Sequence, residues 1–258
     1  MITPISSIKK KNRNLTPRLP LGYIVSYLKY SLRNHRYSDM AHSKGQSFRS
    51  FSYEEELQRA KGLKEDLDKG GWRQVHMSPG ACYWMKTFYN DEVPIKSLFT
   101  FDMPMPAEKF VEVLNPSNQE IRKKWDEVFK DHVILEAYPD NGGYLTSSRI
   151  KTTWPLADRE FLLFIPPVIQ VDWYGKESWF IIQKNAWHLS KPEGENGLVR
   201  ATNGGNFYIV TPDDERPEAA CKVFSLTNNN YNGRLPRQGW NGCLAGLFRE
   251  ASMGCEQA

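Results

Sequence analysis

The chain has 258 residues, a formal net charge of +4 and 13% aromatic residues, among them eight tryptophans. This length suits one sizeable domain with an appendage, and the aromatic content favours a large apolar interior. Eight basic residues and no acidic one precede Asp39, which leaves 26 basic against 30 acidic residues in the rest of the chain. A basic arm on a mildly acidic domain argues against nucleic-acid binding, because no basic stripe recurs in the folded part.

The arm, residues 1–52, is rich in Ser, Asn, Lys and Arg, and we expect it to be mostly disordered. Three interpretations of it stay open: a solvated tail, an organelle transit peptide, or a segment that rests on an anionic membrane through the basic, aromatic stretch 23–33. Its longest apolar run, residues 19–28, contains Pro20 and Gly22 and is too short to cross a bilayer. The expected location is the cytoplasm, with a mitochondrion or another organelle as the alternative.

Catalytic and metal-binding motifs are missing from the sequence. The four cysteines have no metal-ligand spacing, which is typical of reduced thiols. The five histidines lie far apart and none neighbours a nucleophile motif. We therefore expect a protein that is not an enzyme and that uses no metal and no cofactor.

Residues 53–165 predict helices and strands in a definite order. An amphipathic helix is expected over 53–70, ended by Gly70-Gly71. Strands follow at 72–77, 82–89 and 95–103, the last with clean alternation typical of a half-buried antiparallel sheet. A short helix is expected over 107–114, and a second from Ser117, where Ser117 to Glu120 resembles a capping box and an apolar stripe continues to Phe129. Further strands are expected at 133–135, 144–154 and 161–165.

The rest of the chain predicts more strands and one closing helix. The strands are expected at 168–173, 178–190, 198–210 and 220–227, separated by Gly- and Pro-containing turns. A loop over 228–238 leads to a weak helix over 240–256. Its three glycines each cost about 1 kcal/mol of helix stability relative to alanine. Periodicity by itself indicates an α+β protein with a large antiparallel sheet.

Two motifs in this order resemble the START domain, the lipid-transfer domain related to the steroidogenic acute regulatory protein. Arg122-Lys123-Lys124-Trp125-Asp126 resembles the R-x-x-W-D helix end of that family, and the segment from Trp154 to Phe161 resembles its P-(x)3-R-D-(F/Y) strand start. The resemblance covers roughly residues 50–256. It implies a helix-grip fold, in which a curved antiparallel sheet of about nine strands wraps around a C-terminal helix and encloses a hydrophobic tunnel. The expected domain is therefore residues 53–258.

The resemblance also implies a function. It implies a lipid carrier, expected as a monomer, that encloses one lipid and contacts membranes transiently. In the phosphatidylcholine transfer protein-like branch, the residues that match Arg122 and Asp126 lie inside the cavity and meet phosphate and choline. The remaining expected ligand contacts are Ile150, Trp154, Phe161, Tyr208 and Phe224, for each of which a filled core is an equal alternative. Trp125 and Arg159 are expected in structural roles, and the expected lid residues are Leu235, Trp240, Leu244, Leu247 and Phe248.

The sequence departs from the branch where choline would be held. Choline is recognised by aromatic ring faces, and the three matching positions are Ser148, Phe161 and roughly Gly204, of which only Phe161 is aromatic. Another phospholipid, a ceramide-like lipid, a sterol or a carotenoid therefore stays open as the ligand. Two other functions also stay open: a lipid-sensing or interaction module, and an enzyme of a related helix-grip family if a histidine faces the cavity.

Overall fold

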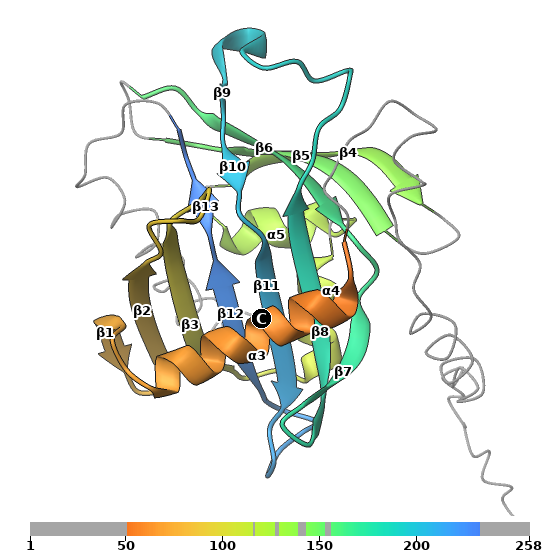
Figure 1. Cartoon of the computed structure of the whole chain (residues 1–258). Coiled ribbons are helices and arrows are strands. Elements are labelled where there is room, and N and C mark those ends of the chain that lie inside the picture. Colours follow the sequence, from red (N-terminus) through yellow and green to blue (C-terminus); the bar gives the residue numbers. More distant parts are fainter. Residues whose placement is uncertain (1–50, 116, 127–128, 139–142, 153–155, 233–258) are drawn as a thin grey trace, which may run out of the picture. The chain divides into compact units, whose positions relative to one another are not determined.

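The structure is a computed structural model that describes residues 51–115, 117–126, 129–138, 143–152 and 156–232 (Figure 1). The helices among these residues are α3 (Tyr53–Asp68), α4 (Ala107–Leu114), α5 (Gln119–Trp125) and a 3-10 turn (Glu195–Gly197). The longer strands are β1 (Arg73–Ser78), β2 (Ala81–Thr87), β3 (Ile95–Met103), β4 (Phe129–Tyr138), β5 (Gly143–Ile150), β6 (Arg159–Ile165), β7 (Ile169–Trp173), β8 (Lys176–Asn185), β11 (Asn206–Pro212) and β12 (Cys221–Thr227). Three short strands complete the set: β9 (Val199–Arg200), β10 (Thr202–Asn203) and β13 (Asn229–Asn230). None of the described helices is long and apolar enough to span a bilayer.

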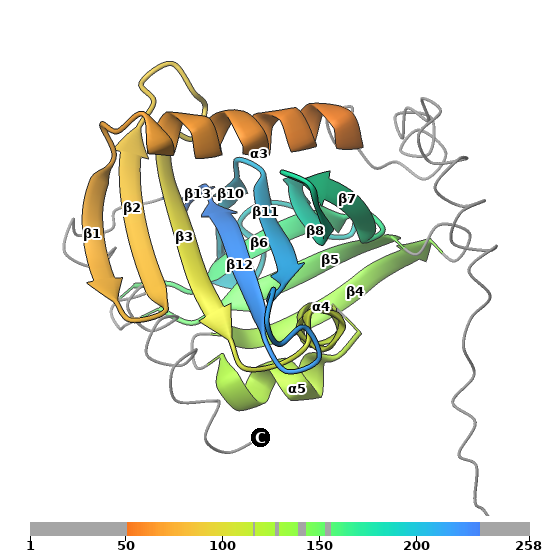
Figure 2. The ribbon, with the colours of Figure 1, turned by 90° about the horizontal axis from the view of Figure 1, so that it is seen from below.

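One large sheet organises the described residues. Nine of its strands follow one another, paired antiparallel, in the order β1-β2-β3-β12-β11-β8-β6-β5-β4. β7 pairs with β8, β9 pairs with β6, and β10 forms a separate ladder with β13. The sheet curves, with α3 against one face and α4 and α5 on the other side (Figure 2). This is the expected α+β helix-grip arrangement, and the expected C-terminal helix falls on residues outside the described ranges.

Local signals explain where α3 begins and ends. Its N-cap is Ser52, whose hydroxyl accepts a hydrogen bond from the backbone N–H of Glu55 at 3.4 Å. The first turn carries three glutamates, which the positive end of the helix dipole favours. Gly70 and Gly71 follow with φ of 89° and 85°, a backbone region that glycine adopts readily. The predicted helix is therefore confirmed to within two residues.

The face of the sheet that α3 covers, here called the outer face, carries the largest core. Alternate residues of neighbouring strands meet there because side chains in a strand point to opposite faces with a period of two. Phe51, which the sequence placed in the arm, is buried in this core and belongs to the ordered domain. The buried residues of the core include Ala60, Leu63, Leu98, Leu145, Leu162, Phe164, Phe180, Ile182, Phe207, Ile209, Phe224 and Leu226.

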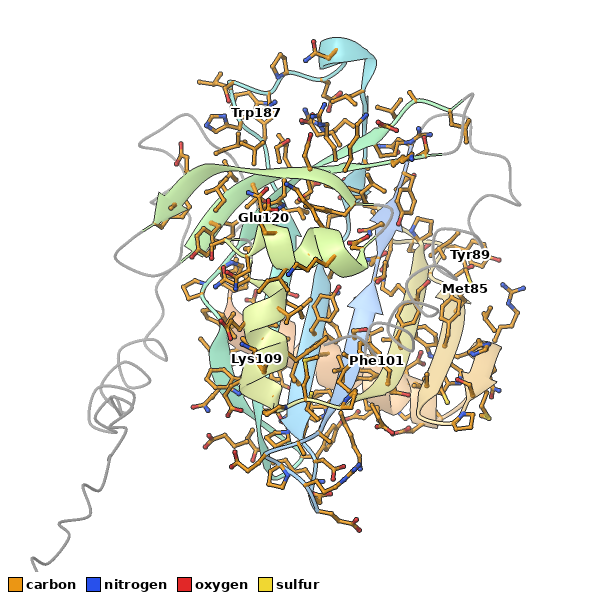
Figure 3. All side chains as sticks on the ribbon, turned by 180° about the vertical axis from the view of Figure 1, so that it is seen from behind. Met85, Tyr89, Phe101, Lys109, Glu120 and Trp187 are labelled. Carbon is orange, nitrogen blue, oxygen red and sulfur yellow. The ribbon has the colours of Figure 1, made fainter. Side chains whose placement is uncertain are left out.

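The opposite face, here called the inner face, is covered in part by α4. Phe110 of α4 packs there against Met103, Ile181, Val210 and Val223 from four strands. Figure 3 looks onto this side of the sheet, with α4 and α5 in front and Met85 and Phe101 on β2 and β3. The alternation within each strand thus divides the apolar residues between two separate surfaces.

The helix predicted from Ser117 is shorter than expected. Asn118, not Ser117, is its N-cap, and no side chain caps it. Ser117 is engaged elsewhere, because its N–H and its hydroxyl both donate to Asn115 Oδ1, at 2.9 and 2.7 Å. The helix ends at Trp125 and Phe129 already begins β4. The capping box and the helical placement of Phe129 were therefore wrong.

The strand predicted over residues 198–210 is broken. Gly205 has a φ of 95°, which extended backbone does not allow. Asn203 Oδ1 stabilises the break by accepting the N–H groups of Gly205 and Asn206, at 2.6 and 3.1 Å. Likewise the strand predicted over 178–190 ends at Asn185, whose Oδ1 accepts the N–H of Asn203 at 3.1 Å. Asparagine side chains replace strand pairing at this end of the sheet.

Truncating a residue of the outer-face core tests this arrangement. Phe207 is fully buried there, and we expect Phe207→Ala to lower the free energy of unfolding by about 3–5 kcal/mol. Tyr89→Ala is the matched control, because Tyr89 is 89% exposed, and should change it by less than about 0.5 kcal/mol. Urea unfolding followed by fluorescence measures both, and equal effects would contradict this core assignment.

Candidate functional site

The predicted pair of Arg122 and Asp126 forms at the end of α5. Arg122 Nε donates to Asp126 Oδ2 at 3.0 Å, and the N–H of Phe129 donates to Asp126 Oδ1 at 3.1 Å. Asp126 is only 3% exposed and lies just past the last helical residue, where the helix dipole disfavours negative charge. The arginine and the backbone N–H are thus what holds a buried carboxylate at this position.

The guanidinium also stacks on an aromatic ring. Arg122 Cζ lies 4.4 Å from the centroid of the Phe129 ring, close enough for a cation–π interaction. A third of the Arg122 side chain stays exposed. The guanidinium of Arg122 is therefore held by Asp126 and by the Phe129 ring, while a third of the arginine side chain is exposed.

A histidine that sequence reasoning did not select lies next to this pair. His132 on β4 pairs in register with Ser148 on β5, and its Nδ1 lies 2.6 Å from Ser148 Oγ. Its ring centroid is 6.0 Å from that of Phe129. Burial, with a further contribution from the Arg122 charge, lowers the pKa of His132 to about 4. The imidazole is therefore neutral at physiological pH.

The distal nitrogen of His132 is buried without a partner. The residue is 5% exposed, and no described residue forms a hydrogen bond with Nε2. Leaving a buried polar atom unpaired costs about 1–3 kcal/mol, so such an atom needs an explanation. We call Arg122, Asp126, His132 and Ser148 the polar patch.

Apolar and aromatic residues surround the polar patch. Phe161 on β6 pairs in register with Ser148, and Ile150 packs in the same cluster as Phe161. Tyr208 on β11 lies near the charged pair: burial raises the pKa of Tyr208, Arg122 opposes the rise and Asp126 adds to it. Tyr231, which sequence reasoning did not select, meets Phe161 edge-on with centroids 5.7 Å apart. The structure thus brings five predicted contact residues, Arg122, Asp126, Ile150, Phe161 and Tyr208, to the inner side of the sheet.

Phe224 does not join this group. It belongs to the outer-face core, where its ring stacks on Trp173 with centroids 5.5 Å apart. Successive side chains of a strand point to opposite faces of the sheet. Because Val223 packs with α4 on the inner face, its neighbour Phe224 lies on the outer face. Phe224 thus lies in a filled core, which is the alternative that the sequence analysis gave for it.

The remaining predicted site residues fall outside the described parts of the chain. These are Trp154 and the five lid residues Leu235, Trp240, Leu244, Leu247 and Phe248. Trp125 ends α5, but its side chain is not among those described.

Arg159, predicted as a structural residue, ties β6 to the chain that leads into the C-terminal segment. It is buried, and its Nε and Nη2 donate to the carbonyl oxygens of Tyr231 and Asn232, at 2.6 and 3.1 Å. The neighbouring Glu160 pairs with Arg200 at 2.8 Å. Arg159 therefore bonds to backbone carbonyls in addition to lying beside acidic residues.

Two of the three positions that would hold choline carry no aromatic ring. Ser148 is engaged by His132, and Phe161 is the aromatic one. At Gly204 no side chain fits, because a Cβ atom would lie 2.3 Å from Asn228 Nδ2 and 2.9 Å from Val93 Cβ. The sequence difference at residue 204 is thus a packing requirement of this fold.

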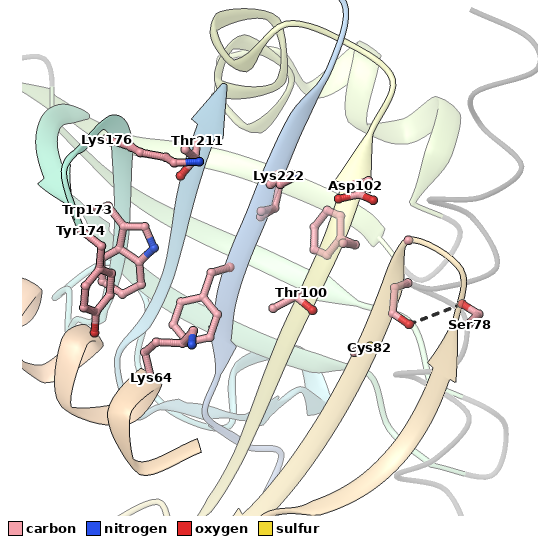
Figure 4. Close-up of a pocket in the computed structure, with 15 residues that line it drawn as sticks. Lys64, Ser78, Cys82, Thr100, Asp102, Trp173, Tyr174, Lys176, Thr211 and Lys222 are labelled. Atoms are coloured by element: carbon pink, nitrogen blue, oxygen red, sulfur yellow. Dashed lines mark hydrogen bonds between the residues drawn. The ribbon is translucent and has the colours of Figure 1, made fainter. Parts of the chain in front are cut away.

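A separate groove lies on the outer face, away from the polar patch. It has a volume of about 530 Å³, and α3 and the aromatic rings of Trp173, Tyr174 and Phe224 border it (Figure 4). Three lysines also line it, Lys64, Lys176 and Lys222, each paired with an aspartate. In the described part of the chain no three His, Cys, Asp or Glu residues gather as a metal site.

The low pKa of His132 predicts a pH-dependent stability. Above about pH 6.5 the ring is neutral in the folded and the unfolded chain, so it contributes nothing. Between pH 6.5 and about 4 the unfolded chain binds a proton that the folded chain excludes. The free energy of unfolding therefore decreases as the pH is lowered, by about 2 kcal/mol at pH 5. His132→Gln should remove this acid-induced loss, as measured by urea unfolding at pH 7 and pH 5.

The matched control for that experiment is His76→Gln, at an exposed position of β1. It should keep the wild-type difference in unfolding free energy between the two pH values. An unchanged difference in the His132→Gln protein would show that this imidazole is not buried in the neutral form.

Comparisons with known proteins were made against family models, curated sequences and solved structures. The family model described as "START domain" matches residues 52–246. The curated sequences contain no match. Human StAR-related lipid transfer protein 5 is 14% identical with a TM-score of 0.60, covering 78% of this chain and 96% of that one.

Two other human structures share the fold. STARD10 is 17% identical with a TM-score of 0.58, covering 77% of this chain and 80% of that one. The StarD13 (DLC2) lipid transfer and protein localization domain is 16% identical with a TM-score of 0.55, covering 74% and 94%. At these identities the structures establish the fold, and the family model establishes the relationship. The chain belongs to the START domain family.

Proposed function

We propose that the protein encloses one phospholipid against the inner face of its sheet and carries it between membranes. The observation that carries the proposal is the Arg122–Asp126 pair, a charged group with a buried carboxylate beside the apolar clusters of the inner face. Charged side chains are rarely buried unless they are paired or serve a ligand. A solvent-exposed helix pair would need neither burial nor an aromatic partner.

The chemistry of the pair fits a phosphate. A guanidinium presents planar donors that match phosphate oxygens, and Asp126 and Phe129 orient it. Acyl chains would lie on the apolar remainder of the inner face, where burial is worth about 0.8 kcal/mol per CH₂ group. Together these features support binding by a polar anchor plus a long apolar contact, without covalent chemistry.

Among phospholipids, the arrangement favours a head group other than choline. A quaternary ammonium has no N–H and is recognised mainly by ring faces, and Gly204 leaves no room for one of the rings. A primary ammonium, by contrast, donates hydrogen bonds and needs no aromatic cage. Phosphatidylethanolamine thus fits the site better than phosphatidylcholine.

The pair of Ser148 and His132 supports binding more than catalysis. The 2.6 Å contact has the length of a nucleophile–base hydrogen bond. An efficient general base, however, has a pKa near the working pH, whereas the pKa of His132 is lowered to about 4. In addition, no described residue orients Nε2 as the third member of a triad. The pair therefore supports a site that binds a ligand without reacting with it.

Exchange of an enclosed lipid requires part of the wall to open near a membrane. The proposed moving part is the C-terminal segment with Leu235, Trp240, Leu244, Leu247 and Phe248. The contacts of Arg159 with Tyr231 and Asn232 would fix the point at which that segment leaves the sheet. In this proposal the segment moves while β6 and β13 stay in place.

Replacing the anchor tests the proposal. Arg122→Gln keeps a donor for Asp126 but removes the charge, and we expect roughly 10- to 100-fold weaker extraction of phosphatidylethanolamine from liposomes. The matched control is Arg149→Gln: Arg149 also pairs with an aspartate, Asp131, and is similarly exposed, but it lies on the outer side of β5. It should extract lipid like the wild type.

The readout is native mass spectrometry of the full chain after incubation with liposomes. The wild-type protein should appear with one bound phospholipid per chain. Equal extraction by Arg122→Gln and wild type would remove the anchor from the proposal, and a wild-type protein that takes up no lipid would refute the function itself.

A further inference from the structure

The distal nitrogen of His132 is the feature that the proposed function leaves unexplained. The imidazole lies on the inner side of β4, and only 5% of the residue is exposed. Nδ1, the ring nitrogen nearer the backbone, is 2.6 Å from Ser148 Oγ. Nε2 is the ring nitrogen farther from the backbone, and it is buried without a hydrogen-bond partner among the described residues.

Counting donors assigns the proton on this ring. If Nδ1 carried the proton and donated to Ser148 Oγ, the serine hydroxyl would lack an acceptor among the described residues and Nε2 would lack a donor. If instead the serine hydroxyl donates to Nδ1, only the Nε2–H group stays unpaired. The second arrangement leaves fewer buried polar atoms without partners and is therefore favoured.

His132 and Arg122 are neighbours, because both lie beside the Phe129 ring and the Arg122 charge acts on the imidazole. Arg122 lies over the Phe129 ring at 4.4 Å, and the His132 ring lies 6.0 Å from the same Phe129 ring. Both groups are donors, one charged and one neutral, whereas Asp126 uses one oxygen for Arg122 and one for the N–H of Phe129. A ligand that contacts both donors must present acceptor oxygens, and the charge of Arg122 favours oxygens that carry negative charge.

We propose that His132 Nε2–H donates a hydrogen bond to a phosphate oxygen of the bound lipid, next to the oxygen that Arg122 holds. This inference rests on the proposed function and names a second residue that selects the phosphate. Ser148 is a positioning residue, because its hydroxyl sets which ring nitrogen carries the proton. A neutral donor suits this place, since a second positive charge beside Arg122 would be repelled by it.

The test compares two lipids that differ only at the head. Liposomes contain phosphatidylethanolamine and a chain-matched diacylglycerol, which keeps both ester carbonyls and lacks the phosphate. Native mass spectrometry gives the ratio of the two lipids bound to the full chain. We expect His132→Phe, which keeps a planar ring without a donor, to lower the bound ratio of phospholipid to diacylglycerol roughly 10- to 100-fold.

His132→Gln is the conservative variant, because its amide N–H₂ reaches close to the position of Nε2. It should restore most of the wild-type ratio. Equal loss of both lipids from His132→Phe would mean a structural role or an ester contact and would overturn the proposal, as would an unchanged ratio. A wild-type protein that binds neither lipid would overturn the proposed function as well, which separates the two failures.

A measurement on the wild type keeps the proposal testable if His132→Phe does not fold. Nitrogen-15 NMR of the imidazole reports which ring nitrogen is protonated. At pH 7 we expect the proton on Nε2, and a shift of that signal when phosphatidylethanolamine but not diacylglycerol is bound. A proton on Nδ1, or the same response to both lipids, would refute it.

Discussion

The period of two in an extended strand is the constraint on which this structure depends. Nine strands pair antiparallel in one curved sheet, so every second side chain lies on the same face. The outer face is closed by α3 over a continuous core. The inner face is divided into smaller clusters, with polar groups between them. The core under α3 and the polar patch thus lie on opposite faces of the same sheet.

The charged pair on the inner side shows how a fold can keep a carboxylate out of water. Asp126 lies at a helix C-terminus, an unfavourable place for a negative charge. Arg122 and the N–H of Phe129 compensate it, and the Phe129 ring supports the guanidinium. Because the same Phe129 contacts His132, the helix end and strand β4 form one unit. A change at Phe129 would therefore disturb both proposed donors together.

The groove on the outer face has a different character. Its lysines are already paired with aspartates, and two of its aromatic rings, those of Trp173 and Phe224, are part of the α3 core. The inner-side polar patch, in contrast, has a buried nitrogen that no described residue satisfies. A buried unpaired donor has a definite energetic cost, which a ligand can remove. This chemistry supports the polar patch as the binding site.

Several features were predictable from the sequence because they depend on short-range patterns. The helices over 53–68 and 107–114, and strand β3, follow from local periodicity and turn residues. The Arg122–Asp126 pair follows from a spacing of four residues on a helix. The family motifs led to the helix-grip fold, which the comparison with family models supports.

The rest was decided by tertiary structure. His132 lies opposite Ser148 because the pairing of β4 with β5 shifts by one residue between Glu136 and Ile134, which no local pattern encodes. Phe224 lies on the outer face because a strand's parity relative to its neighbours is fixed by pairing across the sheet. The sequence by itself thus determined the helices over 53–68 and 107–114, strand β3 and which two charges pair. Only the pairing of distant strands decided which side chains share a face, because register depends on contacts between residues far apart in the chain.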